Sequence, residues 1–125
     1  LVSLQRGTGA EQLERCTFRD RFSSAQVAMD GTWAFDDMAA IIEQCDLVIS
    51  ADSAIVHLAA GMGRPTWVLL KAIPEWRWGL EGGDSFWYPS VRLWRQARDG
   101  DWAGLMEAVA GSLQDQIRLG SITPC

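Results

Sequence analysis

Short apolar runs and amphipathic stretches alternate along the chain. Residues 46–50 and 66–70 are apolar runs of strand length, and residues 91–95 alternate apolar and polar side chains. Residues 1–5 and 26–29 are shorter and predict two further strands, the later one closed by an Asp-Gly turn. The hydrophobic pattern therefore predicts strands in five places.

Helical periodicity fills the segments between these strands. We expect helices over four ranges: residues 10–15, 37–44, 53–62 and 102–113, the last extending toward Ile117. Asp36 is placed to cap the second of these helices. Strands that alternate with helices form a parallel sheet between helical layers. The predicted fold class is α/β, a Rossmann-like open parallel sheet with helices on both faces.

The segment from Asp46 to Leu70 is the part of the chain best suited to bind a ligand. It reads as strand, small polar group, helix and strand, and Gly63-Arg64-Pro65 ends the helix. The strands of such a unit lie parallel, and ligands bind where parallel strands end and helices begin. Asp52 and Ser53 stand at that point and are candidate binding residues.

The start of this predicted helix offers donors to an anion. The first amides of a helix have no intrahelical acceptor and carry partial positive charge, so those of Ala54 and Ile55 suit a phosphate. The alternative is that Ser53 is simply a helix N-cap, which stabilises a helix whatever the function. The glycine fingerprint of dinucleotide-binding folds is absent, so NAD and FAD are not supported and no cofactor is expected.

Three further residues are candidates for the same site. His57 lies about one turn into an otherwise aliphatic helix, where it is either a packed structural residue or directs a ring N–H at a phosphate. Gln5 and Arg6 follow the first predicted strand, whose carboxyl end would lie on the same edge of a parallel sheet. Arg6 is then a charge partner for phosphate or, alternatively, a solvated turn residue.

Composition and charge exclude several classes of protein. The chain has 125 residues and a net charge of -5, which argues against a large nucleic-acid surface. The three cysteines lack a metal-ligand spacing and there is one histidine, so we expect neither a disulfide framework nor a metal site. No apolar run is long enough to span a membrane and nothing resembles a signal peptide, so a cytoplasmic protein is expected.

Two other motifs have competing interpretations. Asp99-Gly100-Asp101 resembles a metal-binding Asp-x-Asp, but its position before Trp102 fits a helix cap better. Residues 71–90 form a long connection that is rich in glycine, proline and aromatic residues. The aromatic groups Trp76-Arg77-Trp78 and Phe86-Trp87-Tyr88 can fold this loop onto the sheet or offer a surface to a sugar or a protein.

The central segment resembles a motif of a known family. Residues 47–70, with their Ser-Ala-Asp-Ser-Ala, His-Leu-Ala and Gly-x-Pro-x-Trp elements, are similar to a stretch of bacterial family 9 (heptosyltransferase-like) glycosyltransferases. Residues 2–5, 74–78 and 87–90 resemble the branch of that family associated with tetratricopeptide repeats. The likeness extends over almost the whole chain.

The resemblance implies the C-terminal half of a GT-B fold, in which two Rossmann-like domains face each other across a cleft. Residues 1–125 would form a single nucleotide-sugar-binding domain, a fragment of a longer two-domain protein. The implied reaction is inverting, metal-independent transfer of a sugar to a glycan, lipid or protein acceptor. The general base would come from the missing N-terminal domain, so this fragment alone is expected to be inactive.

The resemblance also implies roles for the candidate residues. Asp52, Ser53, Ala54 and His57 would fall at the diphosphate of the nucleotide-sugar donor. Gln5 and Arg6 would face the same cleft, and Arg6 stands where related enzymes often carry a lysine, so it is a departure from the family pattern.

Two other functions stay open at this point. One is a non-catalytic α/β domain that uses its Trp-rich loop for contact with another protein or for self-association as a homodimer. The other is a different phosphate-binding enzyme, such as an epimerase, which would share this site but need another kind of N-terminal domain.

Overall fold

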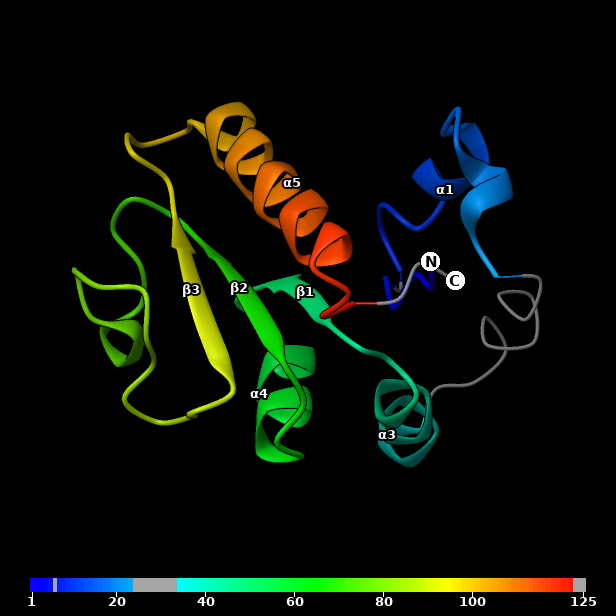
Figure 1. Cartoon of the computed structure of the whole chain (residues 1–125), viewed down its shortest axis with the longest axis horizontal. Helices are drawn as coiled ribbons and strands as arrows, with labels where there is room; N and C mark the ends of the chain where they lie inside the picture. Colours follow the sequence, from blue (N-terminus) through cyan, green and yellow to red (C-terminus); the bar gives the residue numbers. More distant parts are fainter. Residues whose placement is uncertain (6, 24–33, 123–125) are drawn as a thin grey trace. The chain divides into compact units, whose positions relative to one another are not determined.

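The computed structural model of the chain describes residues 1–5, 7–23 and 34–122. These residues belong to two compact units, Leu1–Ala40 and Ile41–Pro124. The second unit contains the sheet and the helices that cover it, so it is described first (Figure 1). The strand predicted over residues 26–29 lies outside the described residues.

A parallel sheet forms the centre of the second unit. Its strands are β1 (Val48–Ala51), β2 (Thr66–Leu70) and β3 (Val91–Arg95), in the order β1-β2-β3. Both neighbouring pairs are parallel, as predicted. The strands expected over residues 66–70 and 91–95 are confirmed with those bounds, whereas the strand expected over 46–50 runs from 48 to 51.

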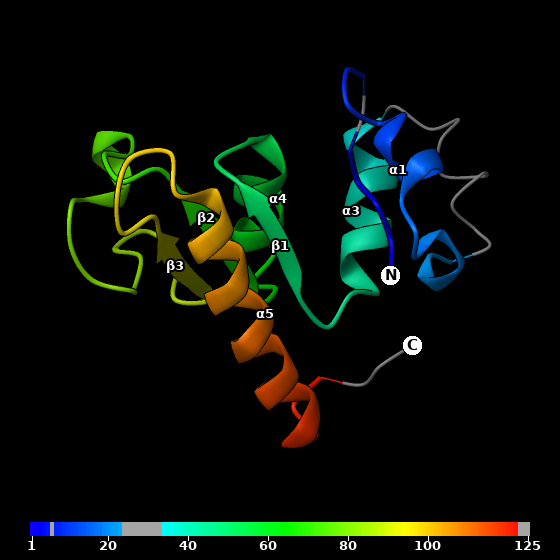
Figure 2. The same cartoon turned by 90° about the horizontal axis from the view of Figure 1, so that it is seen from above.

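Helices cover both faces of this sheet (Figures 1 and 2). α4 (Ala54–Gly61) packs against the face that carries Val68 and Leu70, and α5 (Trp102–Arg118) packs against the face that carries Trp67. Because β2 is the central strand, its side chains are enclosed on both faces, which explains the continuous apolar run in its sequence. The Rossmann-like α/β class is confirmed.

The two helices that cover the sheet begin differently. Asp101 caps α5, since its carboxylate accepts a hydrogen bond from the amide of Gly104 at 3.0 Å. This confirms that the Asp99-Gly100-Asp101 turn is a helix cap. Ser53 occupies the N-cap position of α4, but its side chain makes no capping hydrogen bond. The amides at the start of α4 are therefore not capped by this serine.

α3 (Phe35–Glu43) spans the boundary between the two units. The amide of Met38 donates to the carbonyl of Ala34 at 3.2 Å, so the helix begins before Asp36. The prediction that Asp36 caps this helix is wrong, because that residue lies inside the first turn. Met38 and Ile42 are buried, as the predicted apolar side of the helix requires.

The first unit has little regular structure among its described residues. It contains α1 (Gln12–Arg15) and the 3₁₀ turn η1 (Arg19–Arg21). The strand predicted over residues 1–5 is wrong. The amino group of Leu1 donates to the carbonyl of Arg21 at 3.0 Å, and the amide of Ser23 donates to the carbonyl of Leu1 at 2.8 Å. Residue 1 is thus bonded to the end of η1 instead of to a neighbouring strand.

Residues 71–90 form the long irregular connection that the sequence predicts, with one 3₁₀ turn, η2 (Trp76–Trp78). The later part of this loop runs along β3. The amide of Leu93 donates to the carbonyl of Gly83 at 2.6 Å, and Asp84 pairs with Arg92 in an antiparallel bridge. Because an unpaired strand edge invites pairing with another chain, this contact protects the outer edge of β3.

Arg95, the last residue of β3, holds the middle of this loop in place. Its guanidinium donates to the backbone carbonyls of Trp78 at 2.6 Å, Gly79 at 3.0 Å and Gly82 at 3.1 Å, with a longer contact to Glu81 at 3.5 Å. Burial lowers the pKa of Arg95, although an arginine remains charged in proteins. We refer to Arg95 and these four carbonyls as the Arg95 clamp.

Gly79 is required by the shape of the clamp. Its φ of 65° and ψ of -179° belong to a backbone region that is open essentially to glycine alone. This conformation ends η2 and presents the Gly79 carbonyl to Arg95.

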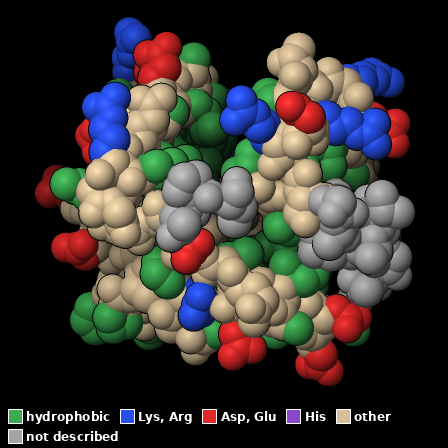
Figure 3. Space-filling model, turned by 45° about the vertical axis from the view of Figure 1, so that its right-hand side comes forward, with side chains coloured by type: hydrophobic (Ala, Val, Ile, Leu, Met, Phe, Trp, Pro, Cys, Tyr) green, Lys and Arg blue, Asp and Glu red, His purple; other side chains and the backbone are tan. Residues whose placement is uncertain are grey.

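Two further observations concern membrane-spanning helices and surface charge. In the part of the chain that the structure describes, no helix is long and apolar enough to cross a membrane. On the face drawn in Figure 3, Lys and Arg side chains are interspersed with Asp and Glu side chains.

Replacement of Arg95 by lysine should loosen the loop while keeping the charge. A lysine ammonium is a point donor and cannot reproduce the fork that reaches several carbonyls. Since one hydrogen bond to a charged group contributes about 1.5–3 kcal/mol, we expect amide hydrogen exchange at Gly79 and Leu93 to accelerate at least about tenfold.

Arg92→Lys is the matched control for this experiment. Arg92 lies on the same strand, but its guanidinium sits over the Trp94 ring, 4.6 Å from the centroid. Unchanged exchange in Arg95→Lys, or equal acceleration in both variants, would contradict the assigned role of the clamp.

Candidate functional site

The candidate site begins where β1 ends. Ser53 has an extended backbone, with φ -152° and ψ 170°, and α4 starts at the next residue. The Ser53 hydroxyl lies 3.1 Å from the Ser50 hydroxyl. The Ser50 hydroxyl donates to the carbonyl of Ala51 at 2.9 Å. The Ser53 hydroxyl is therefore engaged away from the helix. The amides of Ala54 and Ile55 point out of a helix start that has no intrahelical acceptors for them.

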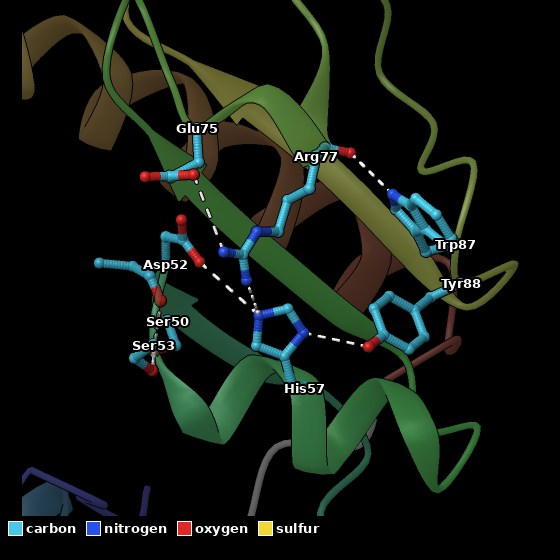
Figure 4. Close-up of polar contacts among 9 residues, drawn as sticks. Ser50, Asp52, Ser53, His57, Glu75, Arg77, Trp87 and Tyr88 are labelled. Atoms are coloured by element: carbon cyan, nitrogen blue, oxygen red, sulfur yellow. Dashed lines mark hydrogen bonds and ion pairs between the residues drawn. The ribbon is translucent and has the colours of Figure 1, made fainter.

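His57 is fixed by three groups from the loop that follows β2, and Figure 4 draws two of them, Arg77 and Tyr88. Its Nδ1 lies 3.0 Å from the hydroxyl of Tyr88, and its Nε2 lies 3.2 Å from Nη1 of Arg77. Its ring stacks on the buried indole of Trp78 at a centroid distance of 5.5 Å. Each of these contacts joins α4 to residues 77–88.

The partners of His57 define its tautomer. A guanidinium has donors only, so Nε2 of His57 must accept the hydrogen bond from Arg77. The ring proton of the neutral imidazole is then on Nδ1, which donates to the hydroxyl of Tyr88. Both ring nitrogens are engaged by protein groups, so an N–H of His57 can reach a phosphate only if one of these contacts is exchanged.

Charged side chains surround the Arg77–His57 contact (Figure 4). Oδ1 of Asp52 lies 3.9 Å from Nε2 of His57, and Oε2 of Glu75 lies 3.8 Å from Nη2 of Arg77. Both distances are too long for hydrogen bonds. Nε of Arg77 is buried and has no hydrogen-bond partner among the described residues. Glu75 therefore neutralises Arg77 only partly, and Nε of Arg77 is unused among the described residues.

The sequence-predicted residues fall into two groups. The structure brings together the five that belong to the second unit: Asp52, Ser53, Ala54, Ile55 and His57. Gln5 belongs to the first unit, where its side-chain amide donates to the carbonyl of Thr8 at 3.1 Å. Arg6 lies outside the described residues. The strand predicted over residues 1–5, which would have brought Gln5 and Arg6 to this edge of the sheet, is absent. Contact of these two residues with the ligand therefore stays a prediction.

Sequence reasoning missed Glu75, Arg77 and Tyr88 as members of the site. The sequence interpretation of Trp76-Arg77-Trp78 uses the two aromatic rings, although the group also contains the charged side chain of Arg77. A usable signal was present, because a loop that follows β2 starts from the same edge of the parallel sheet as Asp52. Charged residues in that loop are thus candidates for the same site.

The aromatic residues of the loop serve two different purposes. Trp78 is buried at 3% exposure and Tyr88 packs partly buried against the same core, which fits the interpretation that the rings fold the loop onto the sheet. Trp76, Phe86 and Trp87 are 77%, 92% and 53% exposed. Trp87 contacts each of the other two edge to face, so the three form one exposed aromatic group.

Metal ligands do not gather in the described part of the chain. No group of three or more His, Cys, Asp or Glu side chains there could hold a metal ion. The donors found at the site are amides, a guanidinium and hydroxyls, which suit an anion.

Comparison with known proteins identifies the family. Residues 3–81 match glycosyltransferase family 9 (heptosyltransferase). The chain is also 39% identical over 80 residues to Protein FlbA of Caulobacter vibrioides, an alignment that covers 64% of this chain and 13% of FlbA. The chain thus spans only a small part of the length of that relative. No solved structure matches it.

The matched range includes β1, α4, β2 and η2, and with them Asp52, His57 and Arg77. It covers more than half of the chain, and the resemblance first drawn from residues 47–70 is confirmed. The chain belongs to glycosyltransferase family 9, the heptosyltransferase family.

Proposed function

We propose that this chain binds the nucleotide-sugar donor of an inverting, metal-independent glycosyltransferase, with the donor diphosphate at the start of α4. The observation that carries the proposal is the helix start itself. Ser53 leaves the amides of Ala54 and Ile55 uncapped at the carboxyl edge of a parallel sheet. Membership of a glycosyltransferase family supplies a ligand that contains a diphosphate.

The side chains around the helix start have complementary tasks in this proposal. The amides and the helix dipole bind phosphate oxygens. Asp52 is a carboxylate and can only accept, so it suits a hydroxyl of the donor and not its phosphates. His57 orients the neighbouring loop through its two ring nitrogens. Gln5 and Arg6 remain proposed contacts to the same donor.

The proposed chemistry of this domain is stabilisation of the leaving group. When the sugar is transferred, negative charge grows on the departing nucleoside diphosphate. The fixed amides at the start of α4 stabilise that charge without having to reorganise. In the whole protein, proposed to be cytoplasmic with a GT-B architecture and tetratricopeptide repeats, the acceptor site and general base belong to another domain.

Ala54→Pro tests whether the helix start binds the diphosphate. Proline is tolerated at the first position of a helix, and the extended backbone of Ser53 is the conformation that precedes proline. The variant should therefore fold normally and lack one amide donor. Loss of a hydrogen bond to a charged group should weaken binding of UDP, ADP or GDP to the full chain by about ten- to one-hundredfold in calorimetric titration.

Ala54→Ser is the matched control, because it changes the same exposed side chain and keeps the amide. Its affinity should stay near that of the wild type. The proposal fails if no nucleoside diphosphate binds the wild type. It also fails if the proline variant unfolds at the wild-type temperature and binds the ligand equally well.

Self-association is a second candidate function, favoured by the exposed aromatic group of Trp76, Phe86 and Trp87. Contiguous exposed rings of this kind are enriched at protein interfaces. The occupant would be a second copy of the chain, giving a homodimer. This function does not exclude donor binding, because the proposed diphosphate contacts are the backbone amides of α4 and not the exposed rings.

Light scattering tests whether this aromatic group mediates self-association. If the aromatic group mediates self-association, the wild type should have the mass of a dimer and Phe86→Ser that of a monomer, since Phe86 is 92% exposed and its loss leaves the core intact. Leu119→Ser, at another exposed apolar residue, should remain a dimer. A monomeric wild type rules this function out.

A further inference from the structure

We infer that Arg77 is the cation that binds the donor diphosphate, that His57 holds its guanidinium in position, and that Glu75 is its counter-ion until the ligand arrives. This inference rests on the proposed function and adds a specific residue to it. None of the candidates drawn from the strand-helix unit supplies a permanent positive charge beside the helix start.

Arg77 reaches the site because of the sheet topology. It lies in η2, in the loop that leaves the carboxyl end of β2, next to the end of β1. Its Nη1 contacts Nε2 of His57, and the same Nε2 is 3.9 Å from Asp52 at the end of β1 (Figure 4). The guanidinium therefore shares one cluster with the residues that lead into α4.

The hydrogen bonding of Arg77 is incomplete without a further acceptor. A guanidinium has five N–H donors. Within the described residues, Nη1 donates to a neutral imidazole, Nη2 faces Glu75 at 3.8 Å, and the buried Nε has no partner. A buried donor without a partner is costly. The Arg77 side chain is 37% exposed, and a guanidinium pairs well with phosphate oxygens.

His57 is less suited than Arg77 to contact the donor phosphates directly. Its ring proton is directed to Tyr88, and its free electron pair accepts from Arg77. The ring thus acts on the ligand through Arg77, as a positioning residue. Stacking on the buried Trp78 fixes the plane of the His57 ring. It therefore also fixes the direction in which Nε2 faces Arg77.

The backbone is restrained at Arg77 and at the residue that follows it. Its carbonyl accepts a hydrogen bond from the indole of Trp87 at 3.0 Å. The next residues belong to the Arg95 clamp, which begins at the carbonyl of Trp78. A guanidinium on a backbone restrained in this way loses less conformational entropy on binding, and this favours affinity.

An ordinary structural interpretation competes with this inference. Arg77 could serve only to tie the loop to α4 through His57. The two interpretations differ in what they predict for the ligand. A structural tie affects stability and all ligands alike, whereas a phosphate-binding cation affects the diphosphate in particular.

The test compares nucleoside diphosphates with the matching monophosphates in calorimetric titrations of the full chain. Arg77→Gln should weaken UDP, ADP or GDP binding by about ten- to one-hundredfold and reduce the preference over UMP, AMP or GMP. Arg77→Lys keeps the charge and should retain most of that preference. Arg118→Gln, at a residue whose side chain is 78% exposed, is the control and should bind as the wild type does.

Glu75→Gln gives a prediction of the opposite sign. Its carboxylate competes with a phosphate for Arg77, and an exposed ion pair contributes about 0.2–1 kcal/mol. Removal of that carboxylate should therefore tighten diphosphate binding by up to about fivefold. The gain should disappear in the Arg77→Gln background, because the two residues act on the same group.

Each outcome decides between the interpretations. An unchanged diphosphate preference in Arg77→Gln, or a Glu75→Gln chain that binds no tighter, overturns the role of Arg77. If Ala54→Pro still weakens binding in that case, the proposed function stands alone. A wild type that binds no nucleoside diphosphate overturns both.

Discussion

The parallel alignment of β1, β2 and β3 is the constraint on which the rest of the structure depends. Parallel strands bring their carboxyl ends to one edge of the sheet, and each strand here contributes to the same region. β1 leads to Asp52 and the start of α4, β2 leads to the loop that carries Arg77, and β3 ends with Arg95. The central strand supports this alignment, because its apolar side chains are buried against both helical layers.

In the proposed function, the affinity of the site for an anion comes from oriented groups and not from net charge. Glu75 faces the guanidinium of Arg77, Asp52 faces His57, and the chain as a whole has a net charge of -5. The uncapped amides and the dipole of α4 place a partial positive charge at the start of this helix, where it can attract a phosphate. The Arg95 clamp and the stacking of His57 on Trp78 restrain the loop that carries Arg77.

The parts of the fold that the sequence predicted well are those fixed by local patterns. β2, β3 and the Asp101 cap follow from apolar runs and capping chemistry. The strand over residues 1–5 was wrong because a short alternation has no structure until a partner pairs with it, and residue 1 bonds to the end of η1 instead. Arg77 was missed because its contact with His57 depends on the return of a long loop, which no periodicity encodes. The motif in residues 47–70 correctly indicated the family, yet it could not reveal that Ser53 leaves its helix uncapped.

The most direct measurement of the central claim is a nuclear magnetic resonance titration of the ¹⁵N-labelled full chain with a nucleoside diphosphate. If the diphosphate binds at the start of α4, the amide protons of Ala54 and Ile55 should shift downfield as they donate to phosphate, and the Arg77 guanidinium signals should move with them. Amides in the last turns of α5 should not change. Saturation of the protein with ligand while the Ala54 and Ile55 signals stay in place would contradict the account.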